Sequence, residues 1–402
     1  MEKATISQCR ESDSFDAIRP FNDDEVRGAI DSLLHDRQFL HILKGMVSFL
    51  PVSVTRSLLR LSTIGIHTTL GFQIRFMKPL VKYILHRCST GYSFSHPGIN
   101  PGSERYTFIS NHRDIVLDSA ILDAMLHDAK FPTTCEIAIG DNLLIYPWIR
   151  TLVRLNKAFI VQRSLPMHEM LKASKTMSGY MHHAIRDKRE NIWIAQREGR
   201  AKDSSDQTQI SLVKMLAISG EEGTAGAISS IKALNIVPLS ISYEYDPCDY
   251  LKALEFQQKR DNPSWKKSKQ DDLLNMKTGI FGQKGHVHYQ TGQPVNTWID
   301  TLSSLPEKEF FQGLAQRIDH EIHRSYQLYG SNRAAADLLT GSSLATTEEQ
   351  VSFAKYLQER IELAAKGIQE VGGKPDYKFL KERLLTMYAN PALNQLSATQ
   401  DP

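Results

Sequence analysis

The chain passes from an apolar run into a helix-like pattern through Ser110-Asn111-His112-Arg113-Asp114-Ile115-Val116-Leu117-Asp118. The run from Tyr106 to Ser110 predicts a core strand. A neutral imidazole can take a proton from a hydroxyl near neutral pH, and a neighbouring carboxylate fixes its tautomer and stabilises the imidazolium that forms. We therefore expect His112 to be a general base at the mouth of this strand, with Asp118 as the carboxylate that orients it.

The spacing of His112 and Asp118 restricts where the two residues lie. On one regular helix, residues six apart are rotated by roughly 240°, so their side chains do not share a face. His112 must then sit in the loop before the helix. Asp114 is the alternative partner, but an Asp just before an apolar-periodic stretch is also typical of a helix N-cap.

Three further segments follow downstream, each built around an apolar run. They are Asn156-Lys157-Ala158-Phe159-Ile160-Val161-Gln162-Arg163, Ile192-Trp193-Ile194-Ala195-Gln196-Arg197-Glu198-Gly199-Arg200-Ala201-Lys202-Asp203 and Ile236-Val237-Pro238-Leu239-Ser240-Ile241. In this order and spacing, the four segments resemble the four sequence blocks of the glycerolipid acyltransferases. That family contains the lysophosphatidic acid and glycerol-3-phosphate acyltransferases. The resemblance covers roughly residues 90 to 300.

Two departures from the family pattern place the chain in a divergent branch. The family usually has four residues between the His and Asp of its first block, whereas five separate His112 from Asp118. The third block usually reads Phe-Pro-Glu-Gly-Thr-Arg. Here Arg197-Glu198-Gly199-Arg200 lacks the proline and one residue before the second arginine.

Cationic side chains follow the apolar runs, at positions where an α/β sheet forms its ligand sites. Arginine matches phosphate oxygens with a planar pair of donors. We therefore expect Arg163 and Arg200, and also Lys202, to bind a substrate phosphate. The resemblance implies that Glu198 and Gly199 shape the same loop, with Glu198 orienting a cation or a substrate hydroxyl. The alternative is that these cations are only solvated strand ends.

The resemblance implies an O-acyltransferase of phospholipid biosynthesis. His112 would take the proton of a lysophosphatidic acid-like acceptor, whose hydroxyl attacks an acyl-CoA or acyl-carrier-protein thioester directly. Glycerol-3-phosphate and a non-phosphate lyso-lipid are alternative acceptors, and a catalytically silent lipid-binding scaffold is the alternative from another class. We expect no cofactor beyond the acyl donor, and no metal. The sequence contains neither a Gly-rich phosphate loop nor a Gly-x-Ser-x-Gly elbow.

Strand-like runs alternate with helical stretches in the middle of the chain, which predicts an α/β fold with a central mixed sheet flanked by helices. We expect an N-terminal helical subdomain over residues 1–88, a catalytic domain over 89–330 and a C-terminal helical extension over 331–402. Helices should fill Asp24 to Arg87 with breaks near Pro51 and Gly71. The last dozen residues are predicted to be a loose tail.

The composition is that of an ordinary globular protein, but the charge is unevenly distributed. Between Asp36 and Glu104 there are eight basic residues and no acidic one. They are Arg37, Lys44, Arg56, Arg60, Arg75, Lys78, Lys82 and Arg87. Basic amphipathic helices of this kind lie in the membrane interface, with cations toward anionic lipids. A helical subdomain that packs on the core with a basic outer face is the alternative.

Two rival interpretations of this basic segment fit less well. Its apolar uncharged stretches Gly45–Thr55 and Leu61–Ile74 hold 11 and 14 residues, short of the roughly 18 to 20 that a spanning helix needs. No nucleic-acid motif accompanies it, so we expect an anionic membrane surface and no nucleic acid as partner. The scattered cysteines and the absence of a secretion signal at the N-terminus predict a peripheral, monotopic protein on the cytoplasmic face of the membrane.

Overall fold

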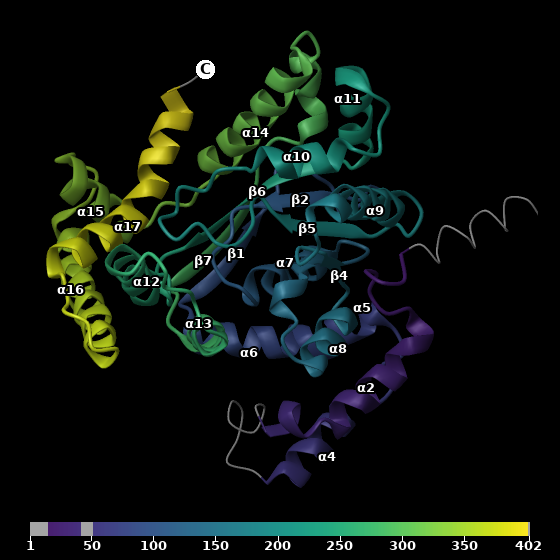
Figure 1. Ribbon diagram of the computed structural model, residues 1–402, viewed down its shortest axis with the longest axis horizontal. Helices are drawn as coiled ribbons and strands as arrows, with labels where there is room; N and C mark the ends of the chain where they lie inside the picture. Colours follow the sequence, from purple (N-terminus) through teal and green to yellow (C-terminus); the bar gives the residue numbers. More distant parts are fainter. Residues whose placement is uncertain (1–14, 42–50, 401–402) are drawn as a thin grey trace, which may run out of the picture.

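A seven-stranded mixed sheet forms the centre of the computed structural model, which describes residues 15–41 and 51–400. The strand order is β1-β7-β6-β2-β5-β3-β4 (Figure 1). The strands are β1 (Gly91–Ser95), β2 (Thr107–Ser110), β3 (Cys135–Gly140), β4 (Ala158–Val161), β5 (Asn191–Ala195), β6 (Ile236–Tyr243) and β7 (His286–Thr291). Neighbouring strands are parallel except β6 and β7, which are antiparallel. The expected α/β fold with a central mixed sheet is confirmed.

Helices cover both faces of the sheet because the central strands are apolar on both sides. One face packs on α6 (Lys78–Cys88) and α7 (Leu117–Asp128), and the other on α9 (Met167–Arg186), α10 (Ile210–Ala217), α11 (Gly223–Ala233) and α14 (Glu307–Arg324) (Figure 1). Side chains alternate between the two cores along each strand. On β6, Ile236 faces the α9 side, whereas Leu239, Ile241 and Tyr243 face the α7 side.

The parallel strands bring the segments of interest to one edge. β6, β2, β5, β3 and β4 all run in the same direction. The loops that follow their carboxyl ends therefore lie along a single rim of the sheet, which is where ligand sites form in α/β folds. His112 follows β2, Arg197 to Lys202 follow β5, and Arg163 follows β4.

The N-terminal helices surround the α7 face, but one of their breaks differs from the prediction. The helices are η1 (Asp23–Glu25), α2 (Val26–His35), α4 (Val52–Ser62), α5 (Thr69–Phe72) and the π-helix η2 (Gln73–Met77). The break expected near Gly71 lies a few residues earlier, between α4 and α5, and Gly71 itself lies inside α5. The chain turns earlier, at Gly65 with φ of 71°, and the Thr68 side chain then caps α5 by accepting the Gly71 N–H. Pro51 directly precedes α4, and residues 42–50 lie outside the described part.

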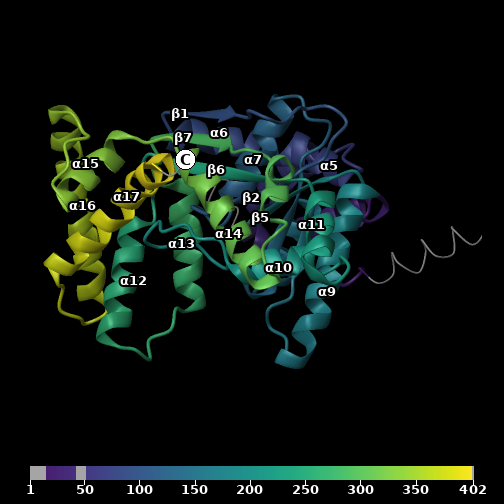
Figure 2. The same cartoon turned by 90° about the horizontal axis from the view of Figure 1, so that it is seen from above.

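C-terminal helices gather at one end of the molecule. Figure 2 shows α15 (Gly330–Thr340), α16 (Thr347–Glu370) and α17 (Tyr377–Gln400) beside α12 (Asp249–Asp261), which leads into α13 (Lys269–Phe281). The expected loose tail is wrong, because α17 runs through Pro391 to Gln400. Asn390 donates to the carbonyl of Asp203, and Asn394 donates to those of Ser204 and Ser205. These bonds hold the end of the chain on the loop after β5.

Candidate functional site

His112 and Asp118 form a buried pair at the carboxyl end of β2. His112 lies in the loop that follows the strand, and Asp118 is on the first turn of α7. His112 Nδ1 is 2.8 Å from Asp118 Oδ2, and the Asp118 side chain is fully buried. Because a carboxylate only accepts hydrogen bonds, Nδ1 carries the proton and Nε2 keeps its lone pair. Within the described residues Nε2 has no hydrogen-bond partner, so it is free to take a proton.

Backbone donors fix the Asp118 carboxylate and show how the loop accommodates its extra residue. Oδ2 also accepts the N–H groups of Arg113 and Asp114, at 2.6 and 3.0 Å. The five intervening residues thus curl around the carboxylate, which bonds to both ends of the turn. Oδ1 accepts the Tyr243 hydroxyl at 3.0 Å. Every oxygen of Asp118 is therefore held by a donor of the fold.

Asp114 has a different role in the same loop. Its Oδ1 accepts the N–H groups of Val116 and Leu117 at 2.9 and 2.7 Å, at the start of α7. No hydrogen bond joins it to His112 in the described part of the chain. Burial, together with the nearby charge of Asp118, raises the pKa of Asp114. The structure therefore pairs His112 with Asp118 and makes Asp114 a cap of the helix.

A second buried ion pair fastens the His112 loop to the loop after β5. Arg113 Nη2 is 2.6 Å from Asp206 Oδ2, and both side chains are almost fully buried. The Tyr326 hydroxyl donates to the same oxygen at 2.6 Å. Asn111 makes two hydrogen bonds with the backbone of Ile241, at 2.7 and 2.9 Å. Sequence reasoning assigned no role to Arg113 or Asp206. One indication of this role is visible in the sequence, which is the charge at position 113 directly after a core strand.

Arg163 and Glu198, two of the expected binding residues, meet in a half-exposed ion pair. Arg163 Nη1 lies 3.3 Å from Glu198 Oε1, with the side chains 32% and 63% exposed. The Arg163 backbone N–H donates to Asp141 Oδ1 at 3.2 Å, which anchors the loop after β4. Gly199 has φ of 66°, a conformation that favours glycine. The loop after β5 thus reaches across β3 to Arg163 with Gly199 as its turn.

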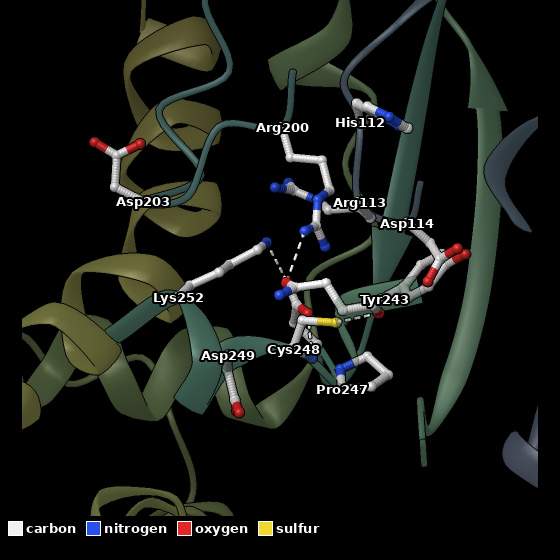
Figure 3. A network of polar contacts seen from close by, with 12 residues as sticks. His112, Arg113, Asp114, Arg200, Asp203, Tyr243, Pro247, Cys248, Asp249 and Lys252 are labelled. Atoms are coloured by element: carbon white, nitrogen blue, oxygen red, sulfur yellow. Dashed lines mark hydrogen bonds and ion pairs between the residues drawn. The ribbon is translucent and has the colours of Figure 1, made fainter. Parts of the chain in front are cut away.

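Arg200 and Lys202 are directed toward the C-terminal helices. Arg200 Nη2 donates to Asn275 Oδ1 on α13 at 3.0 Å. Lys202 pairs with Glu255 on α12. Figure 3 shows the side chains of Arg200 and Lys252 converging beside Cys248, where Lys252 pairs with Asp246. Within the described residues no contact joins Arg163 to Arg200, so the structure does not bring the expected phosphate ligands together.

The pKa values of these two cations shift in opposite directions. Burial disfavours the charged form of Arg200, but the neighbouring groups Cys248, Asp246 and Asp114 raise its pKa overall. Burial lowers the pKa of Lys202 despite its bond to Glu255. Both cations therefore stabilise this part of the fold through anionic or amide partners within the protein.

Three other histidines, His286, His288 and His182, lie within hydrogen-bond distance of hydroxyl groups of the protein. His286 Nδ1 lies 3.0 Å from the Tyr329 hydroxyl, and His288 Nδ1 lies 2.7 Å from Ser93 Oγ. His182 Nε2 lies 3.0 Å from Ser230 Oγ. In residues 15–41 and 51–400, no group of three or more His, Cys, Asp or Glu side chains is placed to hold a metal ion.

Comparisons with known proteins find a family model and a solved structure that are similar to this chain. Residues 94–242 match the model of the family described as Acyltransferase. A search of the curated proteins finds no match. Among solved structures, the crystal structure of the 1-acyl-sn-glycerophosphate (LPA) acyltransferase PlsC from Thermotoga maritima is similar at 10% sequence identity and a TM-score of 0.34. That match covers 70% of this chain and 84% of PlsC.

The matched region contains all four motifs. It begins within β1 and ends within β6, and it includes the His112–Asp118 pair. The match identifies an Acyltransferase-family domain at residues 94–242.

Proposed function

We propose that this acyltransferase transfers a fatty acyl group from acyl-CoA or acyl-carrier protein to the hydroxyl of a lysophosphatidic acid-like acceptor, in phospholipid biosynthesis. The observation that carries the proposal is the His112–Asp118 pair at the carboxyl rim of the sheet, with Nε2 of His112 unpartnered in the described structure. A base of this kind takes a proton from the substrate as the substrate attacks, and the hydroxyl group of an alcohol supplies that proton. No cofactor is needed for this chemistry.

The reaction that these residues support takes place in one addition and one elimination. Nε2 of His112 takes the acceptor's hydroxyl proton while the oxygen bonds to the thioester carbonyl carbon. Asp118 stabilises the imidazolium at Nδ1. The tetrahedral intermediate then collapses, the carbon–sulfur bond breaks, and the thiolate leaves with the proton held by His112. The acyl group passes directly to the acceptor, without an acyl-enzyme.

Arg163 is the strongest candidate for the acceptor phosphate. Its guanidinium is a third exposed, and its partner Glu198 is mostly exposed. A surface ion pair of this kind is worth less than about 1 kcal/mol, so a phosphate with a higher charge can displace Glu198. Arg200 and Lys202 would have to leave Asn275 and Glu255 to join it. We therefore propose Arg163 as the first phosphate ligand, with Glu198 and Gly199 shaping the loop that presents it.

Attachment to an anionic membrane is the second part of the proposal, and α4 is the element that supports it. Val54, Leu58 and Leu61 share one face of α4 and are 41%, 51% and 65% exposed. Arg56 and Arg60 are exposed on the same helix. Of the other cations in the acid-free segment, Lys78 and Lys82 pair with Asp128 on α7 at 2.6 and 2.7 Å. The fold uses part of the basic segment in these ion pairs, and we propose that α4 meets lipid at the cytoplasmic face.

In the described residues, no helix combines the length and hydropathy that crossing a bilayer requires.

Co-sedimentation with anionic vesicles tests α4 as a surface anchor. The variant Leu58→Asp/Leu61→Asp should bind vesicles several-fold more weakly than the native chain. The matched control Val351→Asp/Leu363→Asp changes exposed apolar residues of α16, which lies far from α4 at another edge of the molecule (Figure 1). Equal losses in both variants would contradict the role of α4.

An acceptor panel tests the proposed reaction. Purified protein is incubated with labelled palmitoyl-CoA or palmitoyl-acyl-carrier protein and lysophosphatidic acid, glycerol-3-phosphate or lysophosphatidylcholine. The proposal predicts labelled phosphatidic acid as the main product. Preferred acylation of glycerol-3-phosphate or of the choline lyso-lipid would overturn the acceptor assignment. Lipid binding without any acyl transfer would instead indicate a silent scaffold.

A further inference from the structure

We infer that Tyr243 is a positioning residue that governs proton uptake by His112 through the Asp118 carboxylate. The inference rests on the proposed function only for its catalytic consequence. Tyr243 is the last residue of β6 and lies beyond the fourth sequence block, so neither the motifs nor the family match assigns it a role. Its hydroxyl is 3.0 Å from Asp118 Oδ1.

The fold places Tyr243 by strand alternation. Leu239, Ile241 and Tyr243 point to the same face of β6, toward α7. Asp118 lies on the first turn of α7, so the end of β6 faces its carboxylate. Tyr243 is buried, and burial raises the pKa of its hydroxyl well above the usual range. The hydroxyl therefore remains protonated and serves as a donor.

The two oxygens of Asp118 have separate tasks. Oδ2 faces the loop, where it accepts His112 Nδ1–H and the N–H groups of Arg113 and Asp114. Oδ1 is bonded to Tyr243, its only hydrogen-bond partner among residues 15–41 and 51–400. This bond draws negative charge toward Oδ1 and away from Oδ2, which moderates how strongly Oδ2 stabilises the His112 imidazolium.

Loss of the Tyr243 hydroxyl is therefore expected to raise the pH at which His112 loses its proton. Without this donor, Asp118 carries its charge closer to His112 and stabilises the imidazolium more strongly. His112 would then remain protonated, and unable to act as a base, up to a higher pH. A hydrogen bond to a charged group is stronger than one between neutral groups, and part of this effect reaches His112 through the carboxylate, so we expect an upward shift of about 0.5 to 1 pH unit.

Tyr289 supplies a matched control on the neighbouring strand. It is also fully buried, and its hydroxyl is also 3.0 Å from Asp118, but it donates to the backbone carbonyl. Tyr289→Phe thus removes a buried hydroxyl beside the same residue without touching the carboxylate. A merely structural role of Tyr243 predicts the same behaviour from both variants.

The first measurement is the pH dependence of kcat for the full chain and for Tyr243→Phe and Tyr289→Phe. The acidic limb should move upward by about 0.5 to 1 unit in Tyr243→Phe and stay in place in Tyr289→Phe. The KM of both substrates should remain within about twofold, since Tyr243 contacts neither. Coincident limbs for Tyr243→Phe and the native chain would overturn the inference, and so would equal shifts in both variants.

The second measurement does not depend on turnover. The imidazole of His112 is followed by NMR during a pH titration, with its signal assigned by its absence in His112→Gln. The titration midpoint should rise in Tyr243→Phe. A shifted midpoint in a chain without acyl transfer would refute the proposed function and leave the inference standing. Active enzyme with an unshifted midpoint would do the reverse.

A third variant covers the case in which Tyr243→Phe does not fold. Incorporation of 3-fluorotyrosine at position 243 keeps the shape of the side chain but makes its hydroxyl a stronger donor. The midpoint should then move downward, opposite to the effect of removing the hydroxyl. An unchanged or upward-shifted midpoint with 3-fluorotyrosine would contradict the inference.

Discussion

Asp118→Asn is the substitution that separates the charge of the carboxylate from its shape. The amide fills the same volume, and its oxygen can still accept from the loop N–H groups that now bond to Oδ2. Its NH₂ group would face the Tyr243 hydroxyl, which can rotate to accept. We therefore expect the variant to fold, while the imidazolium of His112 loses its counter-charge.

The size of the effect follows from the 2.8 Å separation of His112 Nδ1 and Asp118 Oδ2. A full charge pair at this distance interacts by about 6 kcal/mol at an effective dielectric constant of about 20. With about half of the proton transferred in the transition state, about 3 kcal/mol of stabilisation is lost. The rate at saturating substrate should therefore fall by about 10².

The assay is steady-state acyl transfer by Asp118→Asn and Asp114→Asn, with circular dichroism to establish folding. Asp114 is the matched control because it is also buried and lies in the same loop, but bonds to the start of α7 instead of His112. Its substitution should cost less than tenfold in kcat. A folded Asp114→Asn protein that is slower than Asp118→Asn would refute the assignment of Asp118 as the partner.

Three further predictions concern other parts of the site. Arg163→Ala should raise the KM for lysophosphatidic acid by about tenfold and leave that for the thioester unchanged; equal increases would place Arg163 elsewhere. Asp206→Ala should lower the free energy of unfolding by about 3 to 5 kcal/mol, because Arg113 is left buried and unpaired. Arg113→Met/Asp206→Leu should lose much less, and an equal loss would contradict this account. Burial raises the pKa of Asp319 to about 7, whereas an unfolded Asp has about 3.9. The folded state therefore binds a proton that contributes stability at low pH and is lost as pH rises through about 7. In chemical denaturation, Asp319→Asn should gain stability relative to the native chain between pH 5 and 8, and a constant difference would contradict the sign.

The parts of the fold that depend on local pattern could be predicted from the sequence. β2 (Thr107–Ser110) lies within the predicted core strand Tyr106–Ser110, and β4 (Ala158–Val161) occupies the apolar run of the second segment. His112 lies in a loop, as the six-residue step to Asp118 required. These features depend on periodicity and on steric limits within a few residues, so they can be predicted from the local sequence.

Features that depend on distant contacts could not be predicted. Tyr243 meets Asp118 only because β6 lies beside β2 and turns that face toward α7. The end of α17 contains Pro391 and several amides, a composition typical of a loose end. Asn390 and Asn394 are nevertheless ordered by carbonyls of the loop after β5. In α17, tertiary hydrogen bonds override the local propensity for a loose end. No sequence pattern within α17 or within the loop after β5 predicts these bonds.

The same limit applies to the phosphate ligands. Arg163 and Arg200 each follow an apolar run, so their order along the chain suggested one site. Arg200 follows β5, and β4 lies two strand positions from β5, about 10 Å along the rim at about 4.8 Å per strand. Where each guanidinium points depends on Glu198 and Asn275. Glu198 lies in the loop after β5 and Asn275 lies on α13, and the spacing of residues along the chain does not predict which of them each arginine contacts.

His112→Ala tests the central claim most directly. The purified native chain and the variant are compared in the transfer of labelled palmitate from the thioester to lysophosphatidic acid, with folding checked by circular dichroism and thermal unfolding. A general base typically contributes about 10² to 10⁴-fold, so formation of labelled phosphatidic acid should fall by at least about 10² in a variant that remains folded. Near-native turnover of folded His112→Ala would contradict the mechanism.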